Sequence, residues 1–194
     1  MQGRRNMMRA KFITGFTLLE LIIALSISAT ILGVGLPTMS NLLNANRVVG
    51  QVNALRGDLA LTRSEAIRRN QQVVICKSHD GQHCNPNAAW DQGWIVYVDA
   101  NQNKERDEEE ALIQIHNELP NGNTLTYRGF GSHNYIAYQP TGITQMNGTF
   151  TLCSSQAPER SRALILMKTG RVRLSSTKPD GGALNCGSSI NSAS

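Results

Sequence analysis

Residues 16–36 read FTLLELIIALSISATILGVGL, an apolar run of 21 residues with one charged side chain. A helix of that length can span the ~30 Å hydrocarbon core of a membrane. The basic residues before it, Arg4, Arg5, Arg9 and Lys11, favour a cytoplasmic position for residues 1–15 and an external position for the rest. A secretory signal peptide is the alternative, but its apolar core is shorter and precedes its small-residue cleavage site. The sequence predicts a transmembrane segment over 16–36.

The composition is that of a folded protein with an unevenly distributed charge. The 194 residues are 40% hydrophobic and 17% charged, with a formal net charge of +5. This balance excludes wholesale disorder, and the length suits one domain with an appendage. Residues 1–15 contain four basic residues and no acid, so they alone contribute +4 to this net charge. The average therefore does not by itself predict a nucleic-acid ligand.

Glu20 is unusual inside the apolar run, because an ionised carboxylate in lipid costs about 2–3 kcal/mol or more. The Glu20 carboxylate either lies close enough to the membrane–water interface to remain hydrated or is paired with another group. The segment Gly15 to Glu20, GFTLLE, resembles the class III signal of type IV pilins and pseudopilins. The resemblance implies that a prepilin peptidase cleaves between Gly15 and Phe16 and that Phe16 is N-methylated. It also implies that Glu20 neutralises the new amino terminus of a neighbouring subunit during assembly.

Residues 37–71 predict the amphipathic second half of one long helix. Apolar or small residues recur at spacings of three and four: Val48, Val52, Leu55, Leu59, Thr62 and Ala66. The arginines of this segment lie largely off the stripe, as a solvated face or as subunit contacts. We expect the stripe to pack on a globular head.

Residues 72–194 predict a β-rich head, because short strand-like runs alternate with Gly, Asn and Pro clusters. The expected strands are Val73–Lys77, Trp94–Asp99, Leu112–His116, Leu125–Arg128, Tyr135–Gln139, Thr149–Cys153, Ala163–Lys168 and Arg171–Ser175. Consecutive strands without intervening helices favour an antiparallel sheet covering one side of the helix. The predicted fold class is α+β and type IV pilin-like. The segments WDQGWIVYVDAN (90–101) and GRVR (170–173) resemble the GspH/FimT branch of pseudopilins and minor pilins.

Four cysteines follow the apolar run and would face an oxidising compartment. The preferred pairs are Cys76–Cys84 and Cys153–Cys186, although four cysteines allow three connectivities. The alternative is a metal site, because His79 and His83 lie between Cys76 and Cys84. That spacing is not a standard zinc pattern, so we expect no zinc.

An acidic segment follows the second strand. Oxygen-bearing residues stand at positions 1, 3, 5, 7, 9 and 12 of an EF-hand-like calcium loop: Asp99, Asn101, Asn103, Glu105, Asp107 and Glu110. Lys104 occupies the position that needs glycine, and strands flank the loop. A solvated acidic hairpin tip is therefore favoured over calcium binding.

A basic segment lies near the carboxyl end. It contains Arg160, Arg162, Lys168, Arg171, Arg173 and Lys178 against two acids. Arg171 and Arg173 are two apart in a strand and leave it on the same face, where their guanidinium groups suit phosphate oxygens. Gly170 would permit a tight turn before them. An ordinary charged strand face, or contacts with acidic neighbours in a fibre, is the alternative.

The GRxR pattern of Gly170, Arg171 and Arg173 resembles a motif that is associated with DNA binding in FimT-type minor pilins. Aromatic residues are absent from the sequence around it, which favours contacts with a duplex backbone over base stacking. The sequence contains no GxSxG, Walker A or HExxH motif, and Gly131-Ser132-His133 is typical of a turn, so we expect neither an enzyme nor a cofactor.

We therefore predict a minor pilin of a type IV pilus that binds extracellular DNA without reading its sequence. Its partners would be other pilins, the prepilin peptidase, the bacterial inner membrane and DNA. The head would face the periplasm and later the pilus surface. The alternative is a type II secretion pseudopilin with a purely structural role, which would need no exposed phosphate-binding arginines.

Overall fold

The computed structural model describes residues 17–156 and 158–186, and the chain divides into two units, 1–41 and 42–194. The predicted leader, with Gly15 and Phe16 at its cleavage site, lies outside the described residues.

Helix α1 (Leu18–Arg69) begins in the first unit and ends in the second. The Thr17 hydroxyl accepts the backbone N–H of Glu20 at 3.3 Å, and the Thr17 carbonyl accepts that of Leu21 at 3.2 Å. Thr17 is thus the N-cap that starts the helix. The side chains of residues 17–32 are exposed in this unit. Among the described residues, the structure contains no helix with the length and apolar character needed to cross a membrane. The transmembrane segment expected over 16–36 is not confirmed.

The second unit contains two four-stranded antiparallel sheets. The first has the order β3-β2-β1-β5, with β1 (Gln72–Lys77), β2 (Trp94–Asp99), β3 (Leu112–His116) and β5 (Tyr135–Tyr138). The second has the order β4-β6-β7-β8, with β4 (Thr124–Phe130), β6 (Asn147–Cys153), β7 (Arg162–Leu166) and β8 (Val172–Ser175). Short 3₁₀ turns at Trp90–Gln92, Pro120–Gly122 and Pro158–Arg160 complete the fold.

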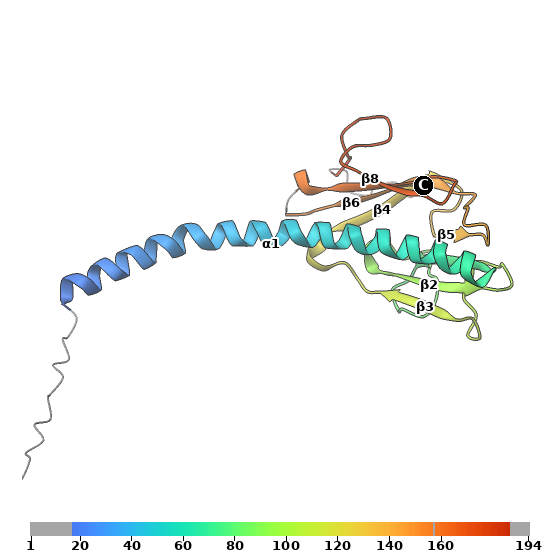
Figure 1. The fold of residues 1–194 in the computed structure, drawn as a ribbon, viewed down its shortest axis with the longest axis horizontal. Coiled ribbons are helices and arrows are strands. Elements are labelled where there is room, and N and C mark those ends of the chain that lie inside the picture. Colours follow the sequence, from blue (N-terminus) through green and yellow to red (C-terminus); the bar gives the residue numbers. More distant parts are fainter. Residues whose placement is uncertain (1–16, 157, 187–194) are drawn as a thin grey trace, which may run out of the picture. The chain divides into compact units, whose positions relative to one another are not determined.

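All eight expected strands are present within the described residues, and the α+β class is confirmed. The expectation of one sheet is wrong. After β4 opens a second sheet, β5 returns to pair with β1 in the first, where Ile75 opposes Ile136. Figure 1 shows the two sheets along the part of α1 that belongs to this unit.

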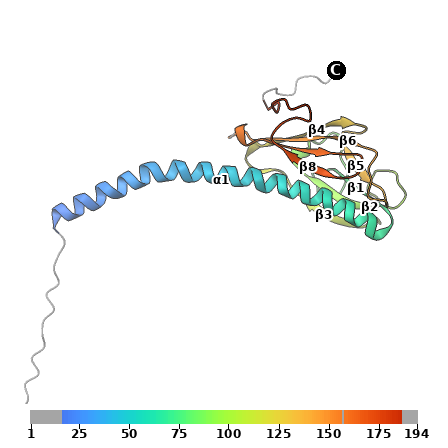
Figure 2. The ribbon, with the colours of Figure 1, turned by 45° about the horizontal axis from the view of Figure 1, so that its top comes forward.

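One core joins the helix to both sheets. The predicted helical stripe is buried, with Leu59 and Ala66 at 0% exposure. It meets Trp94 and Ile136 of the first sheet and Phe150 of the second. Figure 2 shows β8, the edge strand of the second sheet, on the side of the head where α1 runs. A smaller apolar cluster, Val74, Cys76, Ile95 and Tyr97, lies on the other face of the first sheet.

Candidate functional site

The turn between β7 and β8 positions the predicted GRxR residues. The N–H of Gly170 donates to the Met167 carbonyl at 2.8 Å, and the N–H of Met167 donates to the Arg171 carbonyl at 3.0 Å. Gly170 has φ 76°, in the left-handed region that favours glycine. A Cβ at this position would lie 2.2 Å from the Gly142 carbonyl oxygen. The turn can therefore take this form only with glycine at 170.

Tyr138 supports the same turn from the first sheet. Its hydroxyl donates to the Gly170 carbonyl at 3.4 Å, and its ring would be 3.0 Å from a Cβ on Gly170. Burial raises the pKa of Tyr138, so the hydroxyl stays protonated and remains a donor. The turn is thus packed on the core side and exposed on the other.

Arg171 and Arg173 are both exposed, while Val172 between them packs against the core. Arg173 opposes Ile165 in the β7–β8 ladder, and Val172 opposes the buried Leu166. This alternation follows the two-residue period of a strand. The structure therefore presents both predicted arginines at the surface, with Arg173 on the edge strand β8 and Arg171 directly before it.

Helix α1 adds two arginines to this edge. A hollow of about 470 Å³ is lined by Arg56, Ala60, Arg63, Ser64 and Ile67 of the helix and by Gly170, Arg171 and Val172 of the hairpin. None of these described lining residues is acidic. Arg63 Nε donates to the Gly142 carbonyl at 2.9 Å, which fixes its guanidinium next to the turn. The small side chains of Ala60 and Ser64 leave the space open.

The helix arginines were predicted to be a solvated face or a subunit contact, and their position beside the GRxR turn was missed. A signal was available, because Arg56 and Arg63 are seven residues apart and share one helix face. That spacing predicts that they lie together, but it does not say which strand lies beside them.

The outer face of the second sheet carries further cations. The register joins Arg128 to Thr149, Thr149 to Ile165 and Ile165 to Arg173, so the two arginines occupy one cross-strand row. Three strand spacings separate them, or about 14 Å. A second hollow of about 550 Å³ beside this row includes Lys168 and Pro179 in its lining.

An aromatic ring also lies beside the β7–β8 turn, which corrects the expectation that none would be near the motif. Phe130 is 70% exposed, and Lys168 Nζ lies 5.5 Å from the centre of its ring. Forty residues separate Phe130 from Gly170 in the chain, so their proximity depends on β4 and β7 joining one sheet through β6. We name Arg56, Arg63, Arg128, Lys168, Arg171 and Arg173 the basic edge.

The remaining predicted cations have partners of their own. Arg160 faces Glu159 at 3.8 Å, and Arg162 donates to the Ser161 carbonyl at 2.8 Å. Arg160 ends the 3₁₀ turn Pro158–Arg160, and Arg162 begins β7, six residues or about 20 Å of extended chain before Lys168. Lys178 donates to the Asn185 side chain at 2.8 Å within the carboxyl-terminal segment. The structure does not bring Arg160 and Arg162 together with the GRxR turn.

The cysteines form the two preferred pairs, Cys76–Cys84 and Cys153–Cys186. His83 bonds Asp80 at 3.0 Å and His79 bonds Asn85 at 3.1 Å. Within the described part of the chain, no three His, Cys, Asp or Glu side chains are placed to hold a metal ion. Ser132 and His133 lie in the loop between β4 and β5, where the Ser132 hydroxyl accepts the N–H of Asn134 at 3.1 Å.

Comparisons with known proteins place this fold. The profile of a family described as type II transport protein GspH matches residues 51–170. The pilin-like protein PilA1 of Thermus thermophilus is 29% identical over 168 residues, which cover 82% of this chain and 97% of that protein.

Two solved structures are also similar. The type IV minor pilin FimU of Pseudomonas aeruginosa (strain PAO1) gives a TM-score of 0.51 at 19% identity, over 73% of this chain and 96% of that one. The minor pseudopilin EpsH from the type 2 secretion system of Vibrio cholerae gives 0.48 at 12% identity, over 66% and 95%. The likeness to FimU shows a shared pilin-like fold. Because the family profile covers more than half of its residues, the chain belongs to the GspH family of pilin-like minor pilins and pseudopilins.

Proposed function

We propose that this chain is a minor pilin of a type IV pilus that takes part in pilus assembly and binds extracellular DNA for uptake. Membership of the GspH family supports the general class of the protein, which is a minor pilin or pseudopilin that works among other pilins. The assignment to a DNA-binding minor pilin of a type IV pilus rests on the basic edge. Binding would involve the DNA backbone and would not read its sequence.

The basic edge is the observation that carries the proposal. Five cationic side chains from α1 and the β7–β8 hairpin lie at the β8 edge of the second sheet, and Arg128 lies across the sheet on β4. The described lining of the helix-side hollow contains no acid. The guanidinium group of arginine can donate two parallel hydrogen bonds to phosphate oxygens, and such contacts are independent of base sequence. Exposed Phe130 adds a surface on which an unpaired base could stack.

Processing and anchoring are proposed from the amino-terminal sequence. Prepilin peptidase would cut between Gly15 and Phe16, Phe16 would be methylated, and Glu20 would meet a neighbouring amino terminus. Residues 16–36 would hold the subunit in the inner membrane with its head in the periplasm until it enters the pilus. Helix hydroxyls in this segment already bond backbone carbonyls four residues earlier, as an apolar environment requires: Ser26, Ser28 and Thr30.

The second candidate is a type II secretion pseudopilin with a structural role only. The description of the matching family, type II transport protein GspH, favours it. The two candidates share the leader, the helix and the head. They differ in whether the basic edge binds DNA.

The first experiment measures DNA binding by the full chain at several salt concentrations. Fluorescence anisotropy with a labelled duplex and with its single strand gives the affinity of each. If Arg171 and Arg173 each neutralise one phosphate, then R171Q with R173Q should flatten the slope of log K against log salt by about 1.8. An unchanged slope in the double variant would remove the assigned site.

The matched control is R160Q with R162Q. It removes the same charge from the opposite end of β7, so it should leave the slope as it is in the wild type. Deletion of the gene, scored for both DNA uptake and protein secretion, separates the two candidates. A loss of secretion with normal DNA uptake would favour the pseudopilin.

A further inference from the structure

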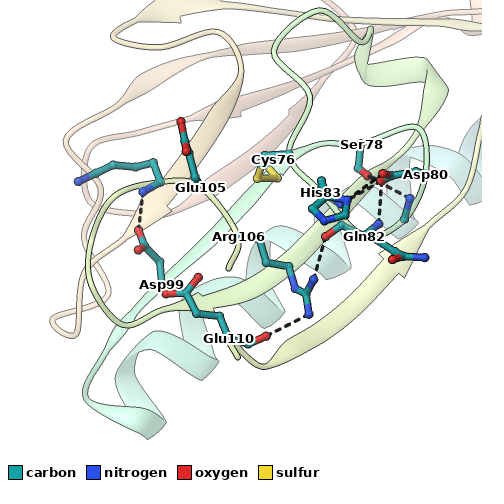
Figure 3. The surroundings of a disulfide bond; sticks show 12 residues. Cys76, Ser78, Asp80, Gln82, His83, Asp99, Glu105, Arg106 and Glu110 are labelled. Carbon is teal, nitrogen blue, oxygen red and sulfur yellow. Dashed lines mark hydrogen bonds and ion pairs between the residues drawn. A yellow bond between two sulfur atoms is a disulfide. The ribbon is translucent and has the colours of Figure 1, made fainter. Parts of the chain in front are cut away.

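The loop between β2 and β3 carries a negative charge that the proposed function does not use. Residues 99–110 hold six acids and two bases, a net charge of −4. The loop is tied to the head: Arg106 donates from Nη1 to the Gln82 carbonyl at 3.0 Å and from Nη2 to the Glu110 carbonyl at 3.2 Å, as Figure 3 shows. The loop is therefore held against the head, although most of its residues are exposed.

The backbone of this loop turns in the way that a calcium loop requires. Lys104 occupies position 6, where EF-hand loops have glycine for a sharp turn. Its φ is 65°, so Lys104 itself takes the left-handed conformation, as does Gln102 at position 4 with φ 63°. The main objection raised by the sequence, the missing glycine, is thereby removed.

Side-chain oxygens at the first three ligand positions face into the loop. Each accepts a backbone N–H from a later loop residue: Asp99 from Lys104 at 3.2 Å, Asn101 from Asn103 at 3.0 Å, and Asn103 from Glu105 at 2.7 Å. At position 12, Glu110 accepts the N–H of Ala100 at 2.8 Å and that of Asp107 at 3.2 Å. The ligand positions therefore surround one small space.

An unpartnered buried oxygen points independently to a ligand. Asp99 is fully buried, and its Oδ2 accepts hydrogen bonds from Lys104 and from the Gln72 amide. Its Oδ1 is buried without a hydrogen-bond partner, and so is the hydroxyl of Tyr97 two residues earlier. Because the bond to Lys104 crosses the loop, the carboxylate is turned toward the loop interior. Buried polar atoms without a partner are costly unless an ion or water satisfies them.

The electrostatic field is consistent with a cation. Residues 99–110 carry a net charge of −4. A cation in the loop would oppose this negative charge. Oxygen-only ligands of the carboxylate and amide type suit a hard divalent ion.

We propose that the loop of residues 99–110 binds one Ca²⁺ ion. Its ligands would be the side-chain oxygens at positions 1, 3, 5, 9 and 12, with the Glu105 carbonyl at position 7. In the described arrangement the amides of Asn101 and Asn103 donate to Asp107 at 2.7 and 3.3 Å, and no three acidic side chains converge. Calcium would replace those amide bonds, so we expect a weak Kd of about 0.1–1 mM.

The test titrates the full chain, with its disulfides formed, with CaCl₂ while following the melting temperature. At about thirty times the Kd, Tm should rise by about 4–8 °C. Terbium(III), which occupies oxygen sites of calcium size, should luminesce on excitation of tyrosine and be displaced by excess Ca²⁺. No change in Tm up to about 10 mM Ca²⁺ would overturn the proposal.

Variants distinguish a site from diffuse charge. E110Q and N101A should each weaken calcium binding at least about tenfold, whereas E108Q should change it less than about twofold. Glu108 is exposed, adjacent in the loop and not at a ligand position, so E108Q removes the same charge as E110Q. D99N is a further variant, and N101A covers the case in which a change at buried Asp99 prevents folding. Equal weakening by E108Q and E110Q would mean that only general charge attraction holds the ion.

Discussion

Gly170 and Gly181 form a natural pair for testing how the β7–β8 turn is held. Both have φ in the left-handed region, 76° and 86°. Alanine in this region costs about 1–2 kcal/mol at either position. At Gly181 an added Cβ meets nothing within 4 Å, whereas at Gly170 it would lie 2.2 Å from the Gly142 carbonyl oxygen and 3.0 Å from the Tyr138 ring. Only G170A therefore adds a clash with the backbone.

The clash should add about 1–3 kcal/mol, the usual cost of overpacking. G170A should thus lower the free energy of unfolding by about 2–5 kcal/mol and G181A by about 1–2 kcal/mol. Urea unfolding followed by tryptophan fluorescence measures both. DNA affinity should fall in G170A and not in G181A, because the turn carries Arg171. Equal destabilisation by the two substitutions would refute the argument that Gly142 and Tyr138 confine the turn.

Two further predictions concern stability. Replacing both cysteines of Cys153–Cys186 by serine should cost about 3.7 kcal/mol, and those of Cys76–Cys84 about 2.5 kcal/mol, because the closed loops span sequence separations of 33 and 8. Urea unfolding that ranks the two variants in the opposite order would contradict this account. The folded-state pKa of His116 is lowered, chiefly by burial and against the attraction of Asp58. Below pH ~6.5 His116 is therefore protonated in the unfolded chain but still neutral in the folded chain. The free energy of unfolding should fall as the pH drops from 6.5 toward the folded-state pKa of His116. H116Q should lack this fall in urea unfolding at pH 7.5 and 5.5, and an identical fall in wild type and variant would assign it to other groups.

Local patterns were enough to predict the elements but not the way in which they pair. The spacing of Val48, Val52 and Leu59 predicts the helix face that is buried. Apolar residues that repeat with a 3.6-residue period line one face of a helix, and that face packs on the core. The pairing of β1 with β5 joins residues more than sixty positions apart, as in Val73 with Tyr138. Strand propensity contains no information on such a partner, so two sheets could not be distinguished from one.

The same limit applies to the site. Gly170 and Arg171 were found because their roles are local: a tight turn and the residue after it. Arg63 reaches the turn from a helix that ends a hundred residues earlier, and Phe130 reaches Lys168 through two intervening strand pairings. In the loop of residues 99–110 the ligand pattern is local and was visible in the sequence, but Lys104 and the flanking strands favoured a solvated tip over the calcium site that we propose. A lysine can take the left-handed conformation when the loop around it supplies enough hydrogen bonds.

The distribution of charge decides how DNA binding would behave. The whole chain has a net charge of +5, but four of these charges belong to residues 1–15, and cleavage after Gly15 would leave +1. A nearly neutral subunit exerts little attraction on DNA beyond a Debye length of about 8 Å. Attraction would then come from the basic edge alone, acting at contact range. Affinity per subunit should therefore be low and steeply dependent on salt, and tight capture would require several subunits to engage one DNA molecule.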